Sequence, residues 1–293
     1  MSRMHKSLVH FLVLICTNTW IDIDCGTNSC FATGLKSCVV KEYDEGKEMV
    51  SDIKKYANSE KTIVLWDCDN VLQMNNDNDF REPNIQKILT NLPNERWGDV
   101  IWNTPKVTVE DWILNCTKCL DETGVKQFVF TQCSSDRNTR DNRKRVLKKL
   151  GYNFFDKAVK FEDEEFNISQ NSLQLRLGQT KITEPVYEDG IIYTGSASKG
   201  RTIIEFFNLL NKVNIKDFNV IFIDDKRKNI DEVKEACEEF GIQKFYGFHY
   251  TFAQNNTEQV SQDKIELYKK LLAPENELYI RKAVEILGFD KIQ

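Results

Sequence analysis

Two pairs of acidic residues in this sequence have the spacing of a metal-dependent site. Asp67 and Asp69 stand one residue apart at the end of an apolar run, and Asp224 and Asp225 end a later one. Carboxylates that crowd together raise one another's pKa unless a cation joins them. Mg2+ prefers oxygen ligands and keeps room for water and a substrate phosphate. We therefore expect all four acids to contribute to a Mg2+ site.

Two further residues supply the groups that phosphoryl transfer would need. Thr131 ends another apolar run, and Lys199 with Gly200 opens a helical pattern. A hydroxyl can donate to phosphoryl oxygens, and an ammonium offsets their negative charge. The sequence lacks the G-x-x-x-x-G-K-[ST] motif of a P-loop, which excludes that class of nucleotide site. The set predicts phosphoryl transfer at a magnesium site.

The apolar runs are the elements that must position these side chains. Within 62–72 an apolar run stops at Asp67, and similar runs cover 127–131 and 219–223. These runs do not alternate between apolar and polar types, which predicts strands buried on both faces. Helical patterns lie between them, at 108–122, at 139–150, from Lys199 onward and at 229–240. Strands separated by helices favour a parallel sheet with right-handed crossovers, and ligands collect at its carboxyl edge. The prediction is an α/β fold with a central, mostly parallel sheet and helices on both faces.

Other segments are less clear in pattern. Residues 38–57 carry apolar side chains at roughly helical spacing and predict an amphipathic helix beside the first strand. Thr108 is the expected N-cap of the helix over 108–122. Residues 190–194 and 244–248 predict short strands, and 258–272 and 275–287 predict helices.

Two charged or cysteine-bearing patterns allow more than one interpretation. The helix over 139–150 is rich in arginine and lysine, which is typical of a solvated face, although an early arginine could instead contact phosphate. Cys116 and Cys119 have redox or zinc spacing, but no second pair follows, so packing on a helix is favoured.

The N-terminus and the net charge bear on location and partners. Basic residues precede the apolar run 8–16, which predicts a signal peptide or an N-terminal anchor within residues 1–32. The run is too short to span a bilayer comfortably. We therefore expect an exported protein, periplasmic or secreted, or one anchored at its N-terminus. The net charge of -5 gives no general attraction to nucleic acid, so no such partner is expected.

The order of the motifs resembles the haloacid dehalogenase (HAD) superfamily. Asp-x-Asp follows the first strand, Thr the second, Lys-Gly precedes a helix and Asp-Asp follows a later strand, over about residues 61–250. The finer pattern resembles a bacterial branch of HAD-like proteins, many with signal peptides, and supplies no substrate. The resemblance implies a Rossmann-like three-layer domain over 38–293, with cap insertions at 73–105 and 152–189.

The resemblance also implies a role for each catalytic residue. Asp67 would be the nucleophile that forms an aspartyl-phosphate, and Asp69 would protonate the leaving oxygen and then activate water. Thr131 and Lys199 would orient the phosphoryl group. Val71 stands where many family phosphatases have threonine, a variant that removes no catalytic atom.

The metal ligands and the overall activity follow from the same resemblance. Asp67 would bind Mg2+ through its carboxylate, Asp69 through its backbone carbonyl, Asp224 directly, and Asp225 directly or through water. The implied activity is Mg2+-dependent hydrolysis of a phosphomonoester, either a phosphorylated small molecule or a phosphoprotein. The alternative is a catalytically silent HAD-like protein that binds a phosphorylated ligand or a partner protein.

Overall fold

The computed structural model describes residues 35–57, 61–90, 104–161, 166, 173–174, 181–210 and 215–273. The predicted signal peptide or anchor over 1–32 and the predicted helix over 275–287 lie outside these residues. Within the described part of the chain, no helix is both long and apolar enough to cross a membrane.

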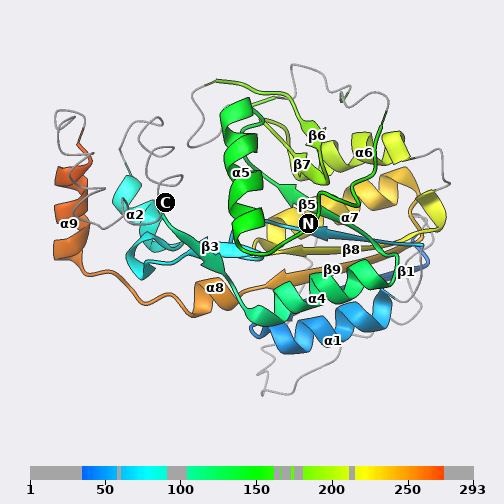
Figure 1. The fold of residues 1–293 in the computed structure, drawn as a ribbon, viewed down its shortest axis with the longest axis horizontal. Helices are drawn as coiled ribbons and strands as arrows, with labels where there is room; N and C mark the ends of the chain where they lie inside the picture. Colours follow the sequence, from blue (N-terminus) through cyan, green and yellow to red (C-terminus); the bar gives the residue numbers. More distant parts are fainter. Residues whose placement is uncertain are drawn as a thin grey trace, which may run out of the picture.

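A seven-stranded sheet forms the centre of the molecule, in the order β1-β9-β8-β2-β5-β7-β6 (Figure 1). Every neighbouring pair is parallel except β6 and β7. This confirms the predicted α/β fold with a mostly parallel sheet. The strands are β1 (Ser37–Tyr43), β2 (Thr62–Trp66), β5 (Lys126–Thr131), β6 (Val186–Glu188), β7 (Ile191–Tyr193), β8 (Asn219–Asp224) and β9 (Lys244–Tyr250).

Helices cover both faces of this sheet because successive residues of the buried strands point to opposite sides. Val64 and Trp66 of β2 belong to one apolar cluster, and Ile63 and Leu65 to another. The first cluster contains residues of α1 (Gly46–Tyr56), α4 (Asp111–Glu122) and α5 (Arg137–Lys149), and the second contains residues of α6 (Lys199–Leu210) and α7 (Arg227–Phe240). A 3-10 turn, η4 (Ile215–Asp217), precedes β8.

Two predictions about local structure were wrong. Residues 38–57 do not form one helix, because β1 comes first and α1 begins only at Gly46. Val39 and Val40 pack against opposite clusters, which is the geometry of a strand. Thr108 ends a strand, and Glu110 occupies the N-cap position of α4. Cys116 packs into the core from α4 as predicted, whereas Cys119 is exposed.

A small lobe stands at one end of the sheet, to the left in Figure 1. It comprises the antiparallel pair β3 (Gln73–Asn75) and β4 (Lys106–Thr108), η1 (Asn78–Phe80), α2 (Asn84–Leu89) and, after α8 (Phe252–Asn255), the helix α9 (Gln262–Leu271). Segments far apart in the chain thus share one core, built from Phe80, Ile85, Ile88, Leu89, Val260, Ile265, Tyr268 and Leu272. Lys264 and Tyr268 of α9 also donate hydrogen bonds of 2.8 Å to Asp79.

Candidate active site

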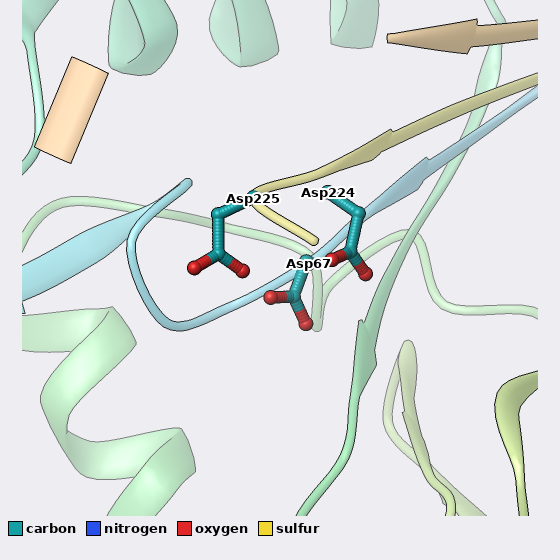
Figure 2. Close-up of side chains that lie close together, drawn as sticks. All are labelled: Asp67, Asp224 and Asp225. Atoms are coloured by element: carbon teal, nitrogen blue, oxygen red, sulfur yellow. The ribbon is translucent and has the colours of Figure 1, made fainter. Parts of the chain in front are cut away.

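Three buried carboxylates meet at the carboxyl edge of the sheet. Asp67 follows β2, Asp224 ends β8, and Asp225 comes next. One oxygen from each lies within 4.8 Å of the others, and Figure 2 shows the three side chains gathered at one place. Because β2 and β8 are parallel neighbours in register, their ends bring these acids together.

Lys199 joins two of these acids. Its Nζ donates hydrogen bonds of 2.6 Å to Asp67 Oδ1 and to Asp224 Oδ2, and its side chain is fully buried. Gly200 explains how the lysine reaches this position, since a Cβ there would lie 2.8 Å from the backbone oxygen of Glu232 on α7. The glycine lets α6 approach α7 closely, and the first residue of α6 then points into the acid cluster.

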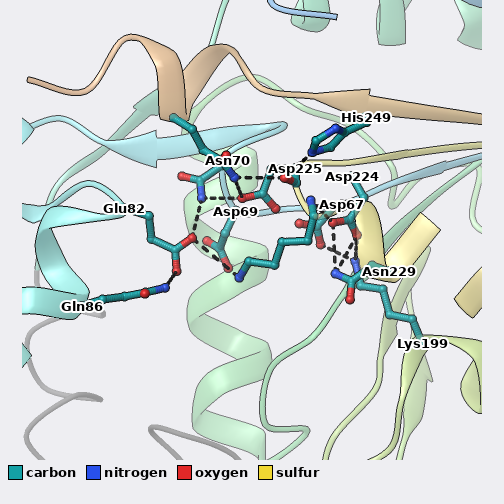
Figure 3. Close-up of polar contacts among 12 residues, drawn as sticks. Asp67, Asp69, Asn70, Glu82, Gln86, Lys199, Asp224, Asp225, Asn229 and His249 are labelled. Atoms are coloured by element: carbon teal, nitrogen blue, oxygen red, sulfur yellow. Dashed lines mark hydrogen bonds and ion pairs between the residues drawn. The ribbon is translucent and has the colours of Figure 1, made fainter. Parts of the chain in front are cut away.

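Further polar groups hold the acids in place (Figure 3). Asn229 Nδ2 donates to both carboxylate oxygens of Asp224, at 3.0 and 3.1 Å. Asn70 Nδ2 donates to Asp225 Oδ2 at 2.9 Å and to Glu82 Oε2 at 3.1 Å. The backbone oxygen of Asp225 lies 3.1 Å from His249 Nε2. The two asparagines thus hold the carboxylates of Asp224 and Asp225 in one orientation.

The acid cluster carries more negative charge than Lys199 balances. Burial raises the pKa of Asp67 well above its usual range; Lys199 opposes this rise, and Asp224 and Asp225 add to it. Burial likewise raises the pKa of Asp225 to about 6, with the charge of Asp224 adding and Lys226 opposing. A divalent cation would relieve this repulsion, and three carboxylates are oxygen ligands of the kind that Mg2+ takes. The donor set therefore fits the predicted metal.

Asp69 has a different environment from the cluster. Its carboxylate receives a bidentate pair of hydrogen bonds from Arg143, Nη1 to Oδ1 at 2.7 Å and Nη2 to Oδ2 at 2.8 Å, and one from Gln73 Nε2 at 2.8 Å. Partial burial would raise the pKa of Asp69, but the charge of Arg143 outweighs it and holds that pKa well below its usual range. Asp69 is therefore ionised here. Its predicted metal contact through the backbone carbonyl stays a prediction.

Thr131 lies at the same edge without joining the cluster. It ends β5, the other neighbour of β2, and is buried. Among the hydrogen bonds of the described residues, none links the Thr131 hydroxyl to Asp67 or to Lys199. Its predicted contact with phosphate therefore stays a prediction.

A pocket of about 360 Å³ opens beside Asp67 and Asp69. The small lobe supplies one wall through Gln73, Glu82 and Lys106. Several of the described residues that line the pocket belong to the insertion over 73–105, and none belongs to the insertion over 152–189. Residues from the described part of the first insertion thus border the same pocket as the acids.

Sequence reasoning missed Arg143, although a signal was present. The buried residues of α5 are Thr139, Arg143 and Leu147, which recur every fourth residue and so share one face of the helix. The many charges around Arg143 favoured a solvated surface.

Asn70 was also missed. Its φ of 64° is a left-handed conformation that asparagine tolerates, and it turns the chain back after Asp69.

Comparison with known proteins identifies a family without a described activity. No curated protein and no solved structure matches this sequence. A family model described as "Protein of unknown function (DUF2608)" matches residues 44–274, most of the chain and all strands except β1. The chain belongs to the DUF2608 family.

Proposed function

We propose that this protein is a Mg2+-dependent phosphomonoester hydrolase of the HAD type, acting through an aspartyl-phosphate on Asp67. One observation carries the proposal: Lys199 bridges Asp67 and Asp224 beside Asp225, and Asp67 borders a pocket. A bound Mg2+ would supply positive charge opposite the phosphoryl oxygens. Asp67, Asp224 and Asp225 would hold it.

The proposed reaction has two halves. A carboxylate oxygen of Asp67 attacks phosphorus, the bond to the leaving oxygen breaks, and that oxygen takes a proton from solvent to leave as the alcohol. Water then attacks the aspartyl-phosphate, which releases inorganic phosphate and restores Asp67. Lys199 holds the Asp67 carboxylate in one orientation through its 2.6 Å bond to Oδ1.

In this conformation Asp69 is better suited to act in the second half of the reaction, the hydrolysis of the aspartyl-phosphate. Its ionised carboxylate, held by Arg143, can accept a proton from the attacking water. Donation to the leaving oxygen in the first half requires a protonated Asp69, and the Arg143 pair disfavours that form. The proposed role of base thus fits the observed contacts more closely than the role of acid.

The proposal also includes a cap over the active site and export or N-terminal anchoring of the protein. The insertion over 73–105 supports a cap function because its residues border the pocket. Export or N-terminal anchoring rests on the basic and apolar order of residues 1–32 alone. The substrate would be a phosphorylated small molecule or a phosphoprotein.

A panel of phosphomonoesters, assayed with and without Mg2+, tests the activity. We expect release of phosphate that EDTA abolishes and that Asp67→Asn lowers at least about 1,000-fold. Asp141→Asn is a matched control, since Asp141 is an exposed acid on α5. Absence of turnover across the panel, or equal turnover in Asp67→Asn, would contradict the proposal.

The Arg143–Asp69 pair supports a second candidate, a protein that binds a phosphorylated ligand without turnover. A carboxylate fixed in a bidentate ion pair is a poor proton donor. Tight binding by wild type and Asp67→Asn alike, with no phosphate released, would favour this candidate over hydrolysis.

A further inference from the structure

The wall of the pocket is made chiefly of carboxamide and charged side chains. Apart from the apolar Met74 and Ile85, the described pocket-lining residues are polar or charged, and none is aromatic. Several are carboxamides that can both donate and accept hydrogen bonds: Asn70, Gln73, Asn75, Gln86, Gln132 and Asn229. Such a wall suits a small hydroxylated or charged molecule better than a nucleobase or an acyl chain.

Lys106 is the unusual member of this wall. It stands on β4 directly opposite Asn75 of β3, and its Nζ donates a hydrogen bond to Asn75 Oδ1. No ion pair found among the described residues includes Lys106. Burial lowers its pKa to about 8, with the charge of Asp69 opposing. A partly buried ammonium held by an amide, rather than by a carboxylate, gains from a nearby anion.

The other cations near the pocket already have acidic partners. Lys199 lies between Asp67 and Asp224, and Arg143 is paired with Asp69. Lys226 Nζ lies 3.6 Å from Glu82 Oε2. Among the described cations at this site, Lys106 is the one without a carboxylate at ion-pair distance.

The position of Lys106 indicates which part of a ligand it would meet. Asp67 and Asp225 line the pocket at the edge of the sheet, whereas Met74, Asn75 and Lys106 line it from the small lobe. A phosphoryl group placed for attack by Asp67 leaves the rest of the substrate to extend toward the lobe.

We propose that the pocket takes phosphomonoesters whose leaving group carries a second anionic group, a carboxylate or another phosphate, and that Lys106 contacts this group. The proposal rests on the proposed hydrolase function and adds the class of substrate. Lys106 would be a specificity residue, since its charge matters for one kind of leaving group and not for the transferred phosphoryl group.

Matched substrates test this role. 3-Phosphoglycerate and glycerol 3-phosphate differ by a carboxylate in place of a hydroxymethyl group, and 2-phosphoglycerate and glycerol 2-phosphate differ in the same way. We expect wild type to prefer the acid of each pair at least about tenfold in kcat/KM, as one charge-assisted hydrogen bond would give. Lys106→Met should abolish the preference by lowering only the values for the acids, and Lys106→Arg should keep part of it.

Lys87→Met is the control variant. Lys87 belongs to the same lobe, is exposed on α2 and donates to Gln259, so its loss should leave both values unchanged. Thermal melts monitored by circular dichroism establish that each variant is folded. Equal losses on acids and alcohols in Lys106→Met, or no preference in wild type, would overturn the proposal.

A binding measurement separates this proposal from the hydrolase itself. Calorimetric titration of Asp67→Asn with 3-phosphoglycerate and glycerol 3-phosphate, in the presence of Mg2+, needs no turnover. Tighter binding of the acid that disappears in Asp67→Asn/Lys106→Met would support Lys106 even if the wild-type protein hydrolysed nothing. Equal binding of the two compounds would overturn the role of Lys106 even if hydrolysis were observed.

Discussion

Arg143 and Asp69 form two parallel hydrogen bonds, of 2.7 and 2.8 Å, that tie the middle of α5 to the turn after β2. The guanidinium side chain is buried, and that of Asp69 is 49% exposed toward the pocket. The pair thus presents one face of an ionised carboxylate to any ligand next to Asp67.

Arg143→Met tests whether this pair positions the proposed base. Loss of the guanidinium raises the pKa of Asp69, so a larger fraction of Asp69 is protonated at acidic pH. We expect kcat to fall about 10- to 100-fold with little change in KM, and the acidic limb of the pH–rate profile to move to higher pH. Arg140→Met, one turn earlier on α5 and paired with Glu188, should leave both unchanged. An unshifted profile in Arg143→Met would show a structural role only.

Lys199→Met should destabilise the protein most when Mg2+ is absent. The substitution leaves Asp67 and Asp224 buried without their shared cation, a loss of about 3 kcal/mol or more. Urea unfolding with and without Mg2+ measures the effect, and Mg2+ should recover part of the loss. Lys41→Met, which breaks an exposed pair with Asp52, should cost less than about 1 kcal/mol in either condition. Equal losses in the two lysine variants would contradict the structure.

Stabilisation by Mg2+ should be larger at pH 7.5 than at pH 5.0. The folded-state pKa values of Asp67 and of Asp225, about 6 for the latter, lie above those of the unfolded chain. Without metal, protons bound by these acids favour folding at low pH, and this contribution is lost as the pH rises through about 6. Mg2+ competes with the same protons. Melting temperatures at both pH values, for wild type and Asp225→Asn, check the trend, which the variant should weaken.

Ile88→Ala should loosen the small lobe more than the sheet. Ile88 of α2 is fully buried in the apolar core that α2 shares with α9. Its truncation should lower the stability of the lobe by about 2 to 5 kcal/mol. Since the lobe walls the pocket, we expect KM to rise and limited proteolysis to begin in the lobe. Leu267→Ala on α9 removes a side chain that is 53% exposed and should change neither. Unchanged KM and proteolysis in Ile88→Ala would show that the lobe core does not support the pocket wall.

The buried strands could be predicted from the sequence because their apolar runs are continuous. β2, β5 and β8 carry such runs, and the common direction of parallel strands accounts for the meeting of Asp67 with Asp224 and Asp225. β1 could not be predicted from the sequence, because it is an edge strand that is only half-buried and its apolar residues also fit a helical spacing.

The site residues outside the strand ends could not be predicted for a different reason. Arg143 is a buried ion on a helix of exposed charges, and Lys106 belongs to a strand of three residues. Arg143 acts through Asp69 and Lys106 contacts Asn75. These contacts form only in the folded protein, so a local sequence pattern does not predict them.

The central place of β2 has a consequence for the kinetics of folding. Both of its neighbours, β5 and β8, come later in the chain, and the bond from Asn70 to Asp225 spans 155 residues. Contacts this distant in sequence form slowly, because the loop between them must close first. A metal held by both strand ends would therefore bind only after the sheet is complete. We expect Mg2+ to slow the unfolding rate in stopped-flow experiments and to leave the folding rate unchanged.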